Sequence, residues 1–244
     1  MPAEPSGRPP AEERVPLSYD SLHDLVGPIN QISSLTGLLL KQYGDRLGPD
    51  AEVMIGLLQS SVNRLQNLLA GFRTYTRIVN EKGPMQLCDG NALLSGSLTS
   101  MQAAIEESGA SVTHGEIPEL YCDPAQIAYL LTSLIENALK FRGQGPCEIH
   151  VSAVANDGRW ILSVRDNGIG IDPKFHKRIF EMFKRVHNEQ YPGAGVGLTI
   201  AERIIQRHGG TIWLESELGR GATFFFSLPR GLVSEEKGSA NAYA

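Results

Sequence analysis

Glycine residues at alternate positions precede a helical pattern in the second half of the chain. Gly193, Gly195 and Gly197 form a Gly-x-Gly-x-Gly segment, and Leu198 follows directly. Bare N–H groups at the start of a helix bind phosphate well. The spacing differs from the Gly-x-Gly-x-x-Gly of dinucleotide-binding folds, and no strand–helix–strand pattern surrounds it. The segment therefore predicts a phosphate site of another kind.

An aspartate with two glycines behind it ends an apolar strand pattern. Asp166 follows Trp160–Val164, and Gly168 and Gly170 come next. A carboxylate at this place can accept a hydrogen bond from the amino group of adenine, and the glycines let the backbone approach a flat base closely. An Asp-Asn-Gly turn is also common in proteins without any such ligand. Taken alone, the segment leaves both interpretations open.

A polar pair lies late in the predicted helix that precedes this strand. Asn137 and Lys140 are three residues apart, so their side chains project from nearly the same face. Mg²⁺ prefers oxygen ligands and takes only one or two of them from protein when phosphates are present. Asn137 can supply such an oxygen, and Lys140 can pair with phosphate. Without further context, a solvated helix face explains the pair as well.

One histidine near the N-terminus has a setting suited to nucleophilic chemistry. His23 lies off the apolar stripe that Leu22, Val26 and Ile29 form on the first predicted helix, so the imidazole should be exposed. An exposed imidazole can attack phosphorus through one ring nitrogen while Asp24 takes the proton from the other. An isolated exposed histidine is usually an ordinary surface residue, so this interpretation depends on the rest of the chain.

Two helical patterns joined by a short turn precede these nucleotide-type segments. The first covers residues 17–43, and the second runs from about Asp50, its expected N-cap, to about Val79. Together they predict an antiparallel helical hairpin over residues 17–80. A lone hairpin cannot cover its own apolar stripes, so we expect a homodimer in which two hairpins form a four-helix bundle.

Past Gly83–Pro84 the pattern changes to short strands alternating with helices. Helices are predicted over residues 89–108, 123–141 and 196–208, and strands over residues 85–88, 111–114, 148–155, 159–165, 211–216 and 222–228. This order predicts an α+β fold in which helices pack on a sheet that contains an antiparallel hairpin. The ATP-binding type of domain discussed below covers residues 85–230. Residues 1–16, rich in proline and charge, and residues 231–244 are predicted to be disordered.

Composition excludes several classes of protein. The net charge of the 244 residues is −5 and no basic block stands out, so nucleic acid is not expected as a partner. No apolar run reaches the roughly 18 residues that a membrane span needs. Three widely spaced cysteines, Cys88, Cys122 and Cys147, form no metal or disulfide pattern, which suits a reducing cytoplasm.

Four segments in the second domain occur in a recognisable order. They are Asn137–Phe141, Asp166–Gly170, Phe180–Phe183 and Gly193–Leu198. In this order and spacing they resemble the N, G1, F and G2 boxes of the ATP-binding domain shared by histidine kinases, gyrase B, Hsp90 and MutL. The resemblance covers roughly residues 85–229. It implies an α/β sandwich that binds ATP and Mg²⁺.

The resemblance also assigns roles within this domain. It implies that Asn137 is the Mg²⁺ ligand, that Lys140 and Phe141 lie at the nucleotide, and that Asp166 recognises adenine. Thr223, in Gly219–Phe224, resembles a hydroxyl residue that supports this aspartate from a neighbouring strand. The segment 171–192 would be the ATP lid, with Phe180 and Phe183 anchoring it to the helical bundle or to its own domain.

The segment Ser21–Ile29 is similar to the phosphoacceptor box of sensor histidine kinases, phytochrome-type enzymes among them. The resemblance implies that ATP phosphorylates His23 with Asp24 as general base, and that the phosphate then passes to an aspartate of a response regulator receiver domain. It further implies a cytoplasmic protein of a two-component system, driven by an upstream sensor domain or partner. The chain departs from the family at Val26, where a basic residue is usual, and at Gly27, where threonine or asparagine is frequent.

Two other classes of protein are alternatives to a sensor histidine kinase. A serine-directed anti-sigma kinase or a hydrolytic ATPase would share the same domain, but neither explains the helical hairpin with His23. Hydrolytic members carry a glutamate four residues before the asparagine, where this chain has Ser133. A dimeric phosphotransfer scaffold that has lost ATP binding is the non-enzymatic alternative, and the intact Asn137, Asp166 and glycine segments argue against it.

Overall fold

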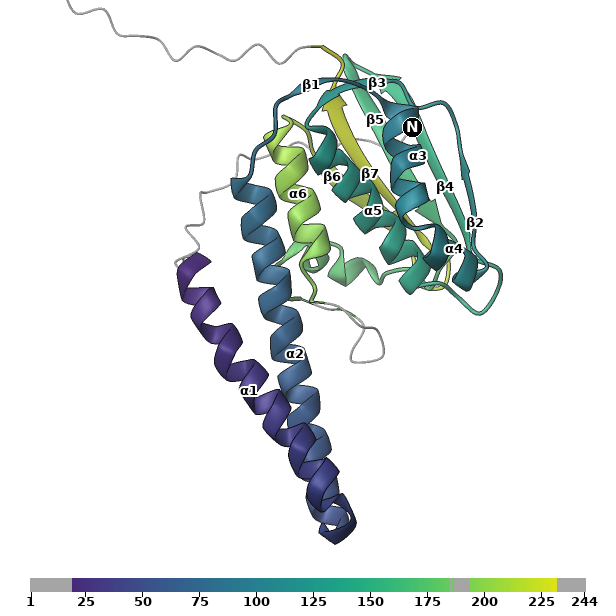
Figure 1. The fold of residues 1–244 in the computed structure, drawn as a ribbon. Coiled ribbons are helices and arrows are strands. Elements are labelled where there is room, and N and C mark those ends of the chain that lie inside the picture. The colour runs from purple at the N-terminus through teal and green to yellow at the C-terminus, as the bar shows by residue number, and fades with distance from the viewer. Residues whose placement is uncertain (1–18, 185, 187–193, 232–244) are drawn as a thin grey trace, which may run out of the picture. The chain divides into compact units, whose positions relative to one another are not determined.

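The structure is a computed structural model that describes residues 19–184, 186 and 194–231 (Figure 1). It divides into two compact units. One comprises residues 83–173 with the chain from Ala201 onward, and the other comprises the hairpin up to Lys82 with residues 174–200. The sequence had placed residues 174–200 in the ATP-binding domain, so the contact boundary differs from the predicted one. The α+β prediction is confirmed.

The hairpin unit consists of two long helices, α1 (Tyr19–Tyr43) and α2 (Pro49–Asn80). A short 3-10 helix, Gly44–Arg46, lies between them. Gly48 is the N-cap of α2 and makes no side-chain capping bond, while Pro49 occupies the first turn. The prediction of Asp50 as N-cap is therefore wrong: proline starts the helix because its fixed φ suits the first position. Asp50 lies in the first turn, where its charge meets the positive helix end.

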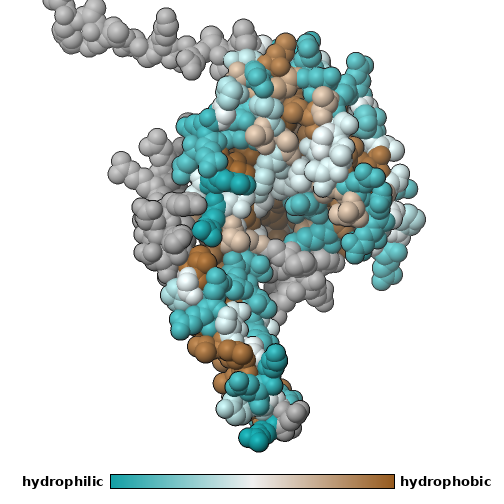
Figure 2. All heavy atoms as spheres, in the orientation of Figure 1, coloured by the Kyte–Doolittle hydropathy of each residue, from teal (hydrophilic) through white to brown (hydrophobic). Residues whose placement is uncertain are grey.

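Only part of the apolar seam of the hairpin is buried. The buried cluster consists of Ile29, Val62, Leu69 and Phe72, with Val26 and Met182 packed against it. Brown patches lie along the part of the hairpin that Figure 2 shows. Large apolar side chains that stay exposed on the two helices include Ile32, Leu35, Leu38, Leu39, Val53, Met54, Leu57, Leu58 and Leu65. Exposed apolar patches of this kind mark an interaction site. None of the described helices is long and apolar enough to cross a membrane.

A five-stranded sheet in the order β2-β4-β5-β7-β6 forms the centre of the other unit. Its strands are β2 (Ser111–His114), β4 (Glu148–Asn156), β5 (Arg159–Asp166), β6 (Ile212–Ser216) and β7 (Ala222–Pro229). All neighbours are antiparallel except β2, which runs parallel to β4. Asp157 and Gly158, both at positive φ, close the predicted β4–β5 turn, as expected of a tight hairpin turn.

Helices cover one face of this sheet (Figure 1). They are α3 (Gly90–Ser100), α4 (Gln102–Ser108), α5 (Pro124–Lys140) and α6 (Gly197–Arg207). The side chains between helices and sheet are fully buried, among them Leu130, Ile135, Leu162, Ile204 and Phe226. Asp123 caps α5 and Pro124 follows at its first position, so the start predicted for this helix is confirmed.

Two elements of this unit were not predicted. A single helix was expected over residues 89–108, but Met101 leaves the helical conformation (φ −107°, ψ 5°) and separates α3 from α4. A separate ribbon pairs β1 (Gln86–Asp89) with β3 (Glu119–Cys122) in antiparallel register. β1 agrees with the strand predicted over residues 85–88, whereas β3 was not predicted.

Candidate nucleotide-binding site

The carboxylate of Asp166 ends β5 on the face of the sheet that carries the helices. Two backbone N–H groups, those of Gly168 and Ala222, donate to its Oδ1 atom at 2.8 and 3.2 Å. Within the described part of the chain, no group donates to Oδ2. Burial raises the pKa of Asp166, and the two N–H donors offset that rise only in part. One oxygen of a largely desolvated carboxylate is therefore available to a donor such as an amino group.

The loop after Asp166 is joined to the end of α5 by backbone contacts. Ile169 N–H donates to the carbonyl of Phe141 at 3.0 Å. A Cβ atom on Gly168 would lie 2.4 Å from the same carbonyl oxygen, and one on Gly170, at φ +68°, would lie 2.0 Å from the carbonyl oxygen of Glu217. Only glycine fits at both places, so these two residues allow the loop to lie against the end of α5 and against the backbone at Glu217.

Asn137 and Lys140 lie in the last turn of α5, beside this loop. Asn137 is half-buried, and no described residue forms a hydrogen bond with its side-chain amide. The Lys140 ammonium lies 4.8 Å from the centre of the Phe141 ring. Among the described residues, no group of three or more His, Cys, Asp and Glu side chains could hold a metal. A cation near Asn137 would thus need most of its oxygen ligands from a bound phosphate and water, which suits Mg²⁺.

Thr223 does not support Asp166, so that prediction is corrected. Successive strand residues point to opposite faces, and Ala222 and Phe224 are the residues of β7 that share the buried helical face. Thr223 lies opposite Arg165 and Glu215 on the other face. Support for Asp166 comes instead from the Ala222 N–H. Counting back by two from the buried Phe226 would have revealed this in the sequence.

Ser216 is a residue of this site that the sequence did not reveal. Its hydroxyl donates to the carbonyl of Gly221 at 2.7 Å and accepts the N–H of Ile171 at 2.8 Å. It thereby connects the β6–β7 edge to the loop that begins at Asp166. A serine at a strand end is too common to signal such a role by itself.

The glycine segment before α6 belongs to the other compact unit. Gly193 lies outside the described residues. Gly195 has φ +70°, and its carbonyl accepts the N–H of Phe183 at 2.9 Å. The helix α6 begins at Gly197, with Leu198 half-buried as its second residue. Glycines therefore do precede a helix N-terminus, the arrangement expected for phosphate binding.

Residues around Phe183 pack on α2 within the hairpin unit. The Phe183 ring stacks on Phe72 with centroids 6.5 Å apart, and the hydroxyl of Thr199 donates to the carbonyl of Phe180 at 2.8 Å. A Cβ atom on Gly71 would lie 2.5 Å from the Ala194 Cβ, so the two segments touch closely there. Anchoring of Phe183 to the helical hairpin is confirmed, while Phe180 is held by α6.

The predicted phosphoacceptor lies near the start of α1. His23 and Asp24 are both helical, but their side chains lie outside the described part of the structure. The helix continues through Gly27 and Pro28 without interruption. A Cβ atom on Gly27 would meet nothing within 4 Å. The backbone therefore presents this stretch as regular helix with space beside Gly27.

Comparison with known proteins assigns the domain to a class. Residues 122–232 match the family described as histidine kinase-, DNA gyrase B-, and HSP90-like ATPase. This range contains the Asp166 site, the end of α5 and the start of α6. The fold and the site thus define an ATPase domain of this class.

The whole chain is similar to sensor histidine kinases. It is 39% identical to cyanobacterial phytochrome A of Nostoc sp., a match that covers 91% of this chain and 29% of that protein. It is 30% identical to the methanogenesis regulatory histidine kinase FilI of Methanothrix harundinacea, over 86% of this chain and 24% of that one. The crystal structure of full-length ShkA in complex with AMPPNP superposes with a TM-score of 0.59 at 28% identity, covering 85% of this chain and 44% of that one.

These matches include the helical hairpin as well as the ATPase domain. Residues 122–232 carry the matched ATPase family, and the homologues of the chain are phytochrome-type and other sensor histidine kinases. It spans less than a third of the length of these two curated relatives.

Proposed function

We propose that this chain is the catalytic core of a sensor histidine kinase of a two-component system. It transfers the γ-phosphate of ATP to His23 and then to an aspartate of a response regulator receiver domain. The observation that carries the proposal is the Asp166 carboxylate, which is half-buried, held by two N–H groups through one oxygen and without a described donor at the other. Such a group is suited to recognising the amino group of adenine.

Each residue of the site contributes a separate part of nucleotide binding. Asp166 accepts from adenine, and Gly168 and Gly170 place no side chain between the backbone and the base. Lys140 and the N–H groups at the start of α6 hold phosphate oxygens. Asn137 supplies one oxygen to Mg²⁺, which neutralises phosphate charge when bound. The AMPPNP complex of ShkA supports a nucleoside triphosphate as the ligand.

Transfer itself requires little covalent chemistry from the protein beyond the acceptor. The His23 imidazole attacks the γ-phosphorus through one nitrogen, the bond from that phosphorus to the bridging oxygen breaks with ADP as the leaving group, and Asp24 receives the proton of the other nitrogen. Phosphoryl transfer depends mainly on positioning and charge neutralisation. The hairpin therefore carries the acceptor, while the ATPase domain supplies the phosphate donor.

Incubation with γ-labelled ATP and Mg²⁺ tests this function directly. We expect label on the peptide that contains His23, and we expect acid to release it, since phosphohistidine is acid-labile. Label that survives acid would indicate a serine-directed kinase, and release of inorganic phosphate without protein label would indicate a hydrolytic ATPase. Ser133 favours the kinase, because it is buried and offers no carboxylate one turn before Asn137.

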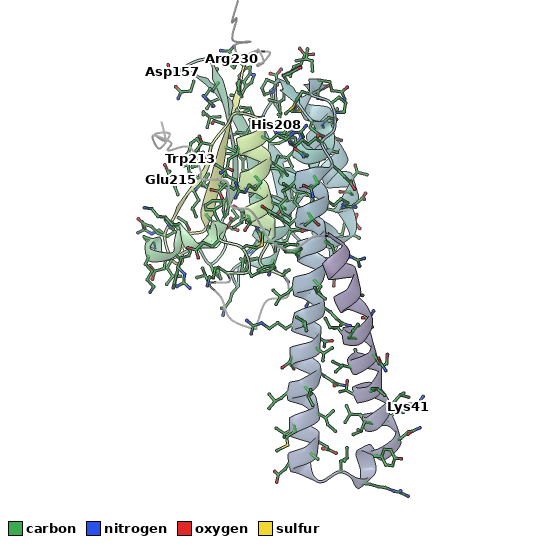
Figure 3. All side chains as sticks on the ribbon, turned by 90° about the vertical axis from the view of Figure 1, so that its left-hand side faces the viewer. Lys41, Asp157, His208, Trp213, Glu215 and Arg230 are labelled. Carbon is green, nitrogen blue, oxygen red and sulfur yellow. The ribbon has the colours of Figure 1, made fainter. Side chains whose placement is uncertain are left out.

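We further propose that the hairpin forms a homodimer. The exposed apolar side chains of α1 and α2 leave a seam that one partner hairpin could cover, as in a four-helix bundle. Light scattering at micromolar concentration should give twice the mass of the chain. Leu35→Glu combined with Leu57→Glu should give a monomer, because both side chains are exposed on the hairpin. Lys41→Ala, at an exposed polar position of α1 (Figure 3), is the control and should stay dimeric. A monomeric wild-type chain would contradict this proposal.

The remaining assignments follow from the family. A sensor domain or partner upstream supplies the signal, and the receiver domain of a response regulator docks on the bundle near His23. A cytoplasmic location suits both the supply of ATP and the three free cysteines.

We predict that this kinase removes phosphate from its regulator only weakly. In related kinases with phosphatase activity, the residue four after the histidine carries a hydroxyl or amide that can hold a water molecule. Here it is Gly27. Asn30 is not a ready substitute, because its Oδ1 accepts the Gln66 amide N–H at 3.0 Å across the hairpin.

The half-life of a phosphorylated receiver domain that accepts phosphate from this chain measures the effect. Wild type plus ADP should leave the half-life nearly unchanged. Gly27→Thr should shorten it, since space for a side chain exists there. The prediction is wrong if the wild-type chain shortens the half-life strongly and the Asn30→Ala variant shortens it as much.

A further inference from the structure

Both backbone polar groups of Gly83, the first residue of the sheet-containing unit, are held by one ion pair. The N–H of Gly83 donates to Oδ2 of Asp123 at 2.8 Å, and Nη2 of Arg207 donates to the carbonyl of Gly83 at 2.7 Å. Nη1 of Arg207 closes the ring by donating to the same Asp123 oxygen at 2.7 Å. Asp123, Arg207 and Gly83 thus form a cyclic group, here termed the linker clamp.

The linker clamp is tightly packed around Gly83 and the Asp123 carboxylate. A Cβ atom on Gly83 would lie 2.8 Å from Oδ2 of Asp123 and 3.0 Å from its Cγ. Asp123 is only 1% exposed. Its burial would raise the pKa of this carboxyl, but hydrogen bonds, foremost that from Arg207, hold the pKa below its ordinary value. The carboxylate is therefore charged when the clamp is formed, and its bonds are charge-assisted.

The same aspartate connects the clamp to the two helices that flank it. Oδ1 of Asp123 caps α5 by accepting the N–H groups of Ala125 and Gln126 at 3.2 and 3.3 Å. Its own N–H donates to Nε2 of His208 at 3.0 Å, directly after α6. His208, which Figure 3 shows on the helical side of the sheet, donates from Nδ1 to the Ile204 carbonyl at 2.7 Å. Gly83 is thereby tied to the start of α5 and the end of α6.

Very little chain separates the clamp from the hairpin. The helix α2 ends at Asn80, and the N–H of Glu81 still donates to the carbonyl of Arg77 at 2.7 Å. Only Glu81 and Lys82 then remain before Gly83. Two residues can span at most about 7 Å. The place and direction in which the chain leaves the sheet-containing unit are therefore fixed by the clamp.

We propose that Asp123 and Arg207 are positioning residues for phosphoryl transfer to His23, acting through Gly83 rather than on the nucleotide. This inference rests on the proposed function. The clamp sits at the start of α5 and the end of α6, while Asn137 and Gly197 lie at the opposite ends of these helices. Loss of the clamp leaves those ligand-bearing ends in place and frees only the connection to the hairpin.

Two substitutions break the clamp without removing its other functions. Asp123→Asn keeps an oxygen at Oδ1 for the α5 cap, but places an NH2 group opposite the donors of Gly83 and Arg207. Arg207→Lys keeps the charge beside Asp123, but a single ammonium lacks the planar fork that reaches Asp123 and Gly83 together. Because a misplacement of about 1 Å can cost about 100-fold in rate, we expect kcat for His23 phosphorylation to fall at least about tenfold, with KM for ATP within about twofold of wild type.

Controls separate positioning from folding. Thermal unfolding reports the stability of each variant, and binding of a fluorescent ATP analogue reports an intact nucleotide site. Insertion of two glycines between Lys82 and Gly83 loosens the connection without touching the clamp and should lower kcat similarly. Adding Arg207→Lys to that insertion should then cost little more, since both act on one step. Arg203→Lys on the same helix, where the Arg203 side chain donates to Gln206 and takes no part in the clamp, should behave as wild type.

The outcomes distinguish this inference from the proposed function. A wild-type chain that binds ATP but never labels His23 removes the proposed function, and the positioning role with it. A wild-type chain that labels His23 while Asp123→Asn and Arg207→Lys keep kcat within about twofold of wild type overturns the clamp alone. Variants whose KM rises with kcat unchanged, or whose costs add fully to the insertion, overturn it as well.

Discussion

Replacing Asp166 with asparagine is expected to weaken ATP binding at least about tenfold and, at the same time, to raise the melting temperature of the ATP-free protein. Asparagine keeps an oxygen for the Gly168 and Ala222 N–H donors. It removes the buried charge and the acceptor that recognises the adenine amino group. Loss of a charge-assisted hydrogen bond in a desolvated site costs roughly 1.5–3 kcal/mol, so nucleotide affinity should fall at least about tenfold.

The stability gain should depend on pH in a defined direction. Burial raises the pKa of Asp166 above its ordinary value of 3.8, so the folded protein holds this proton more tightly than the unfolded chain. Stability contributed by the protonated carboxyl is present below that ordinary value and is lost as pH rises through the folded-state pKa. The difference in melting temperature between Asp166→Asn and wild type should therefore increase as pH rises from about 4 and stop increasing above the folded-state pKa.

Calorimetry and thermal unfolding without nucleotide measure the two effects. Asp157→Asn is the matched control, because Asp157 is exposed in the β4–β5 turn, and asparagine tolerates its φ of 41°. That variant should leave both affinity and melting temperature nearly unchanged. Unaltered ATP affinity in Asp166→Asn would remove the adenine assignment and with it the central observation of the proposed function.

The ATPase domain was predictable because each of its segments has a local signal. Asp123–Pro124 predicts the start of α5, and Asn156–Gly158 predicts a β-hairpin turn. The glycines after Asp166 indicate that the backbone is closely approached there. These signals are short-range chemistry that a sequence displays directly. The fold class and the phosphate- and adenine-type residues follow from them.

The sequence-based predictions are wrong where the conformation of a residue depends on packing against a neighbouring element. Thr223 and Ala222 are equally plausible until the alternation of β7 is set by Phe226 in the core. β3 needs its partner β1 to be recognised as a strand. Residues 174–200 group with the hairpin, because Met182 packs against the cluster that contains Phe72 and Phe183 stacks on Phe72; the resemblance indicated this anchoring for Phe183, but no local pattern moved the domain boundary. Long-range packing of this kind overrides local propensity.

Ser216 and the linker clamp illustrate the same limit at the level of function. Arg207 and Asp123 are far apart in the sequence, and a charged residue at a helix end has an ordinary explanation there as a cap or as a partner of the helix dipole. Only the fold shows that Arg207 and the Gly83 N–H both donate to the same oxygen of Asp123. Sites assembled across elements are therefore found from the structure, while sites built from one segment are found from the sequence.

Replacing His23 with glutamine should eliminate acid-labile phosphorylation while leaving ATP affinity within a few-fold of wild type. The phosphate acceptor is lost, because an amide is neither basic nor nucleophilic at neutral pH. The nucleotide residues Asn137 and Asp166 belong to a different compact unit from the hairpin that carries His23. The expected result is therefore an enzyme that binds the substrate fully and has no place to transfer the phosphate.

Two further variants make this result specific. Asp24→Asn should keep the acceptor but lose the base, with labelling slowed by about 100-fold or more. His150→Gln is the control for removal of an imidazole, since His150 is exposed on β4 and its ring is hydrogen-bonded to the Thr113 hydroxyl at 2.9 Å. It should label at the wild-type rate. If His23→Gln still gains acid-labile label from γ-labelled ATP, the phosphoacceptor is another histidine, and the role assigned to the start of α1 is wrong.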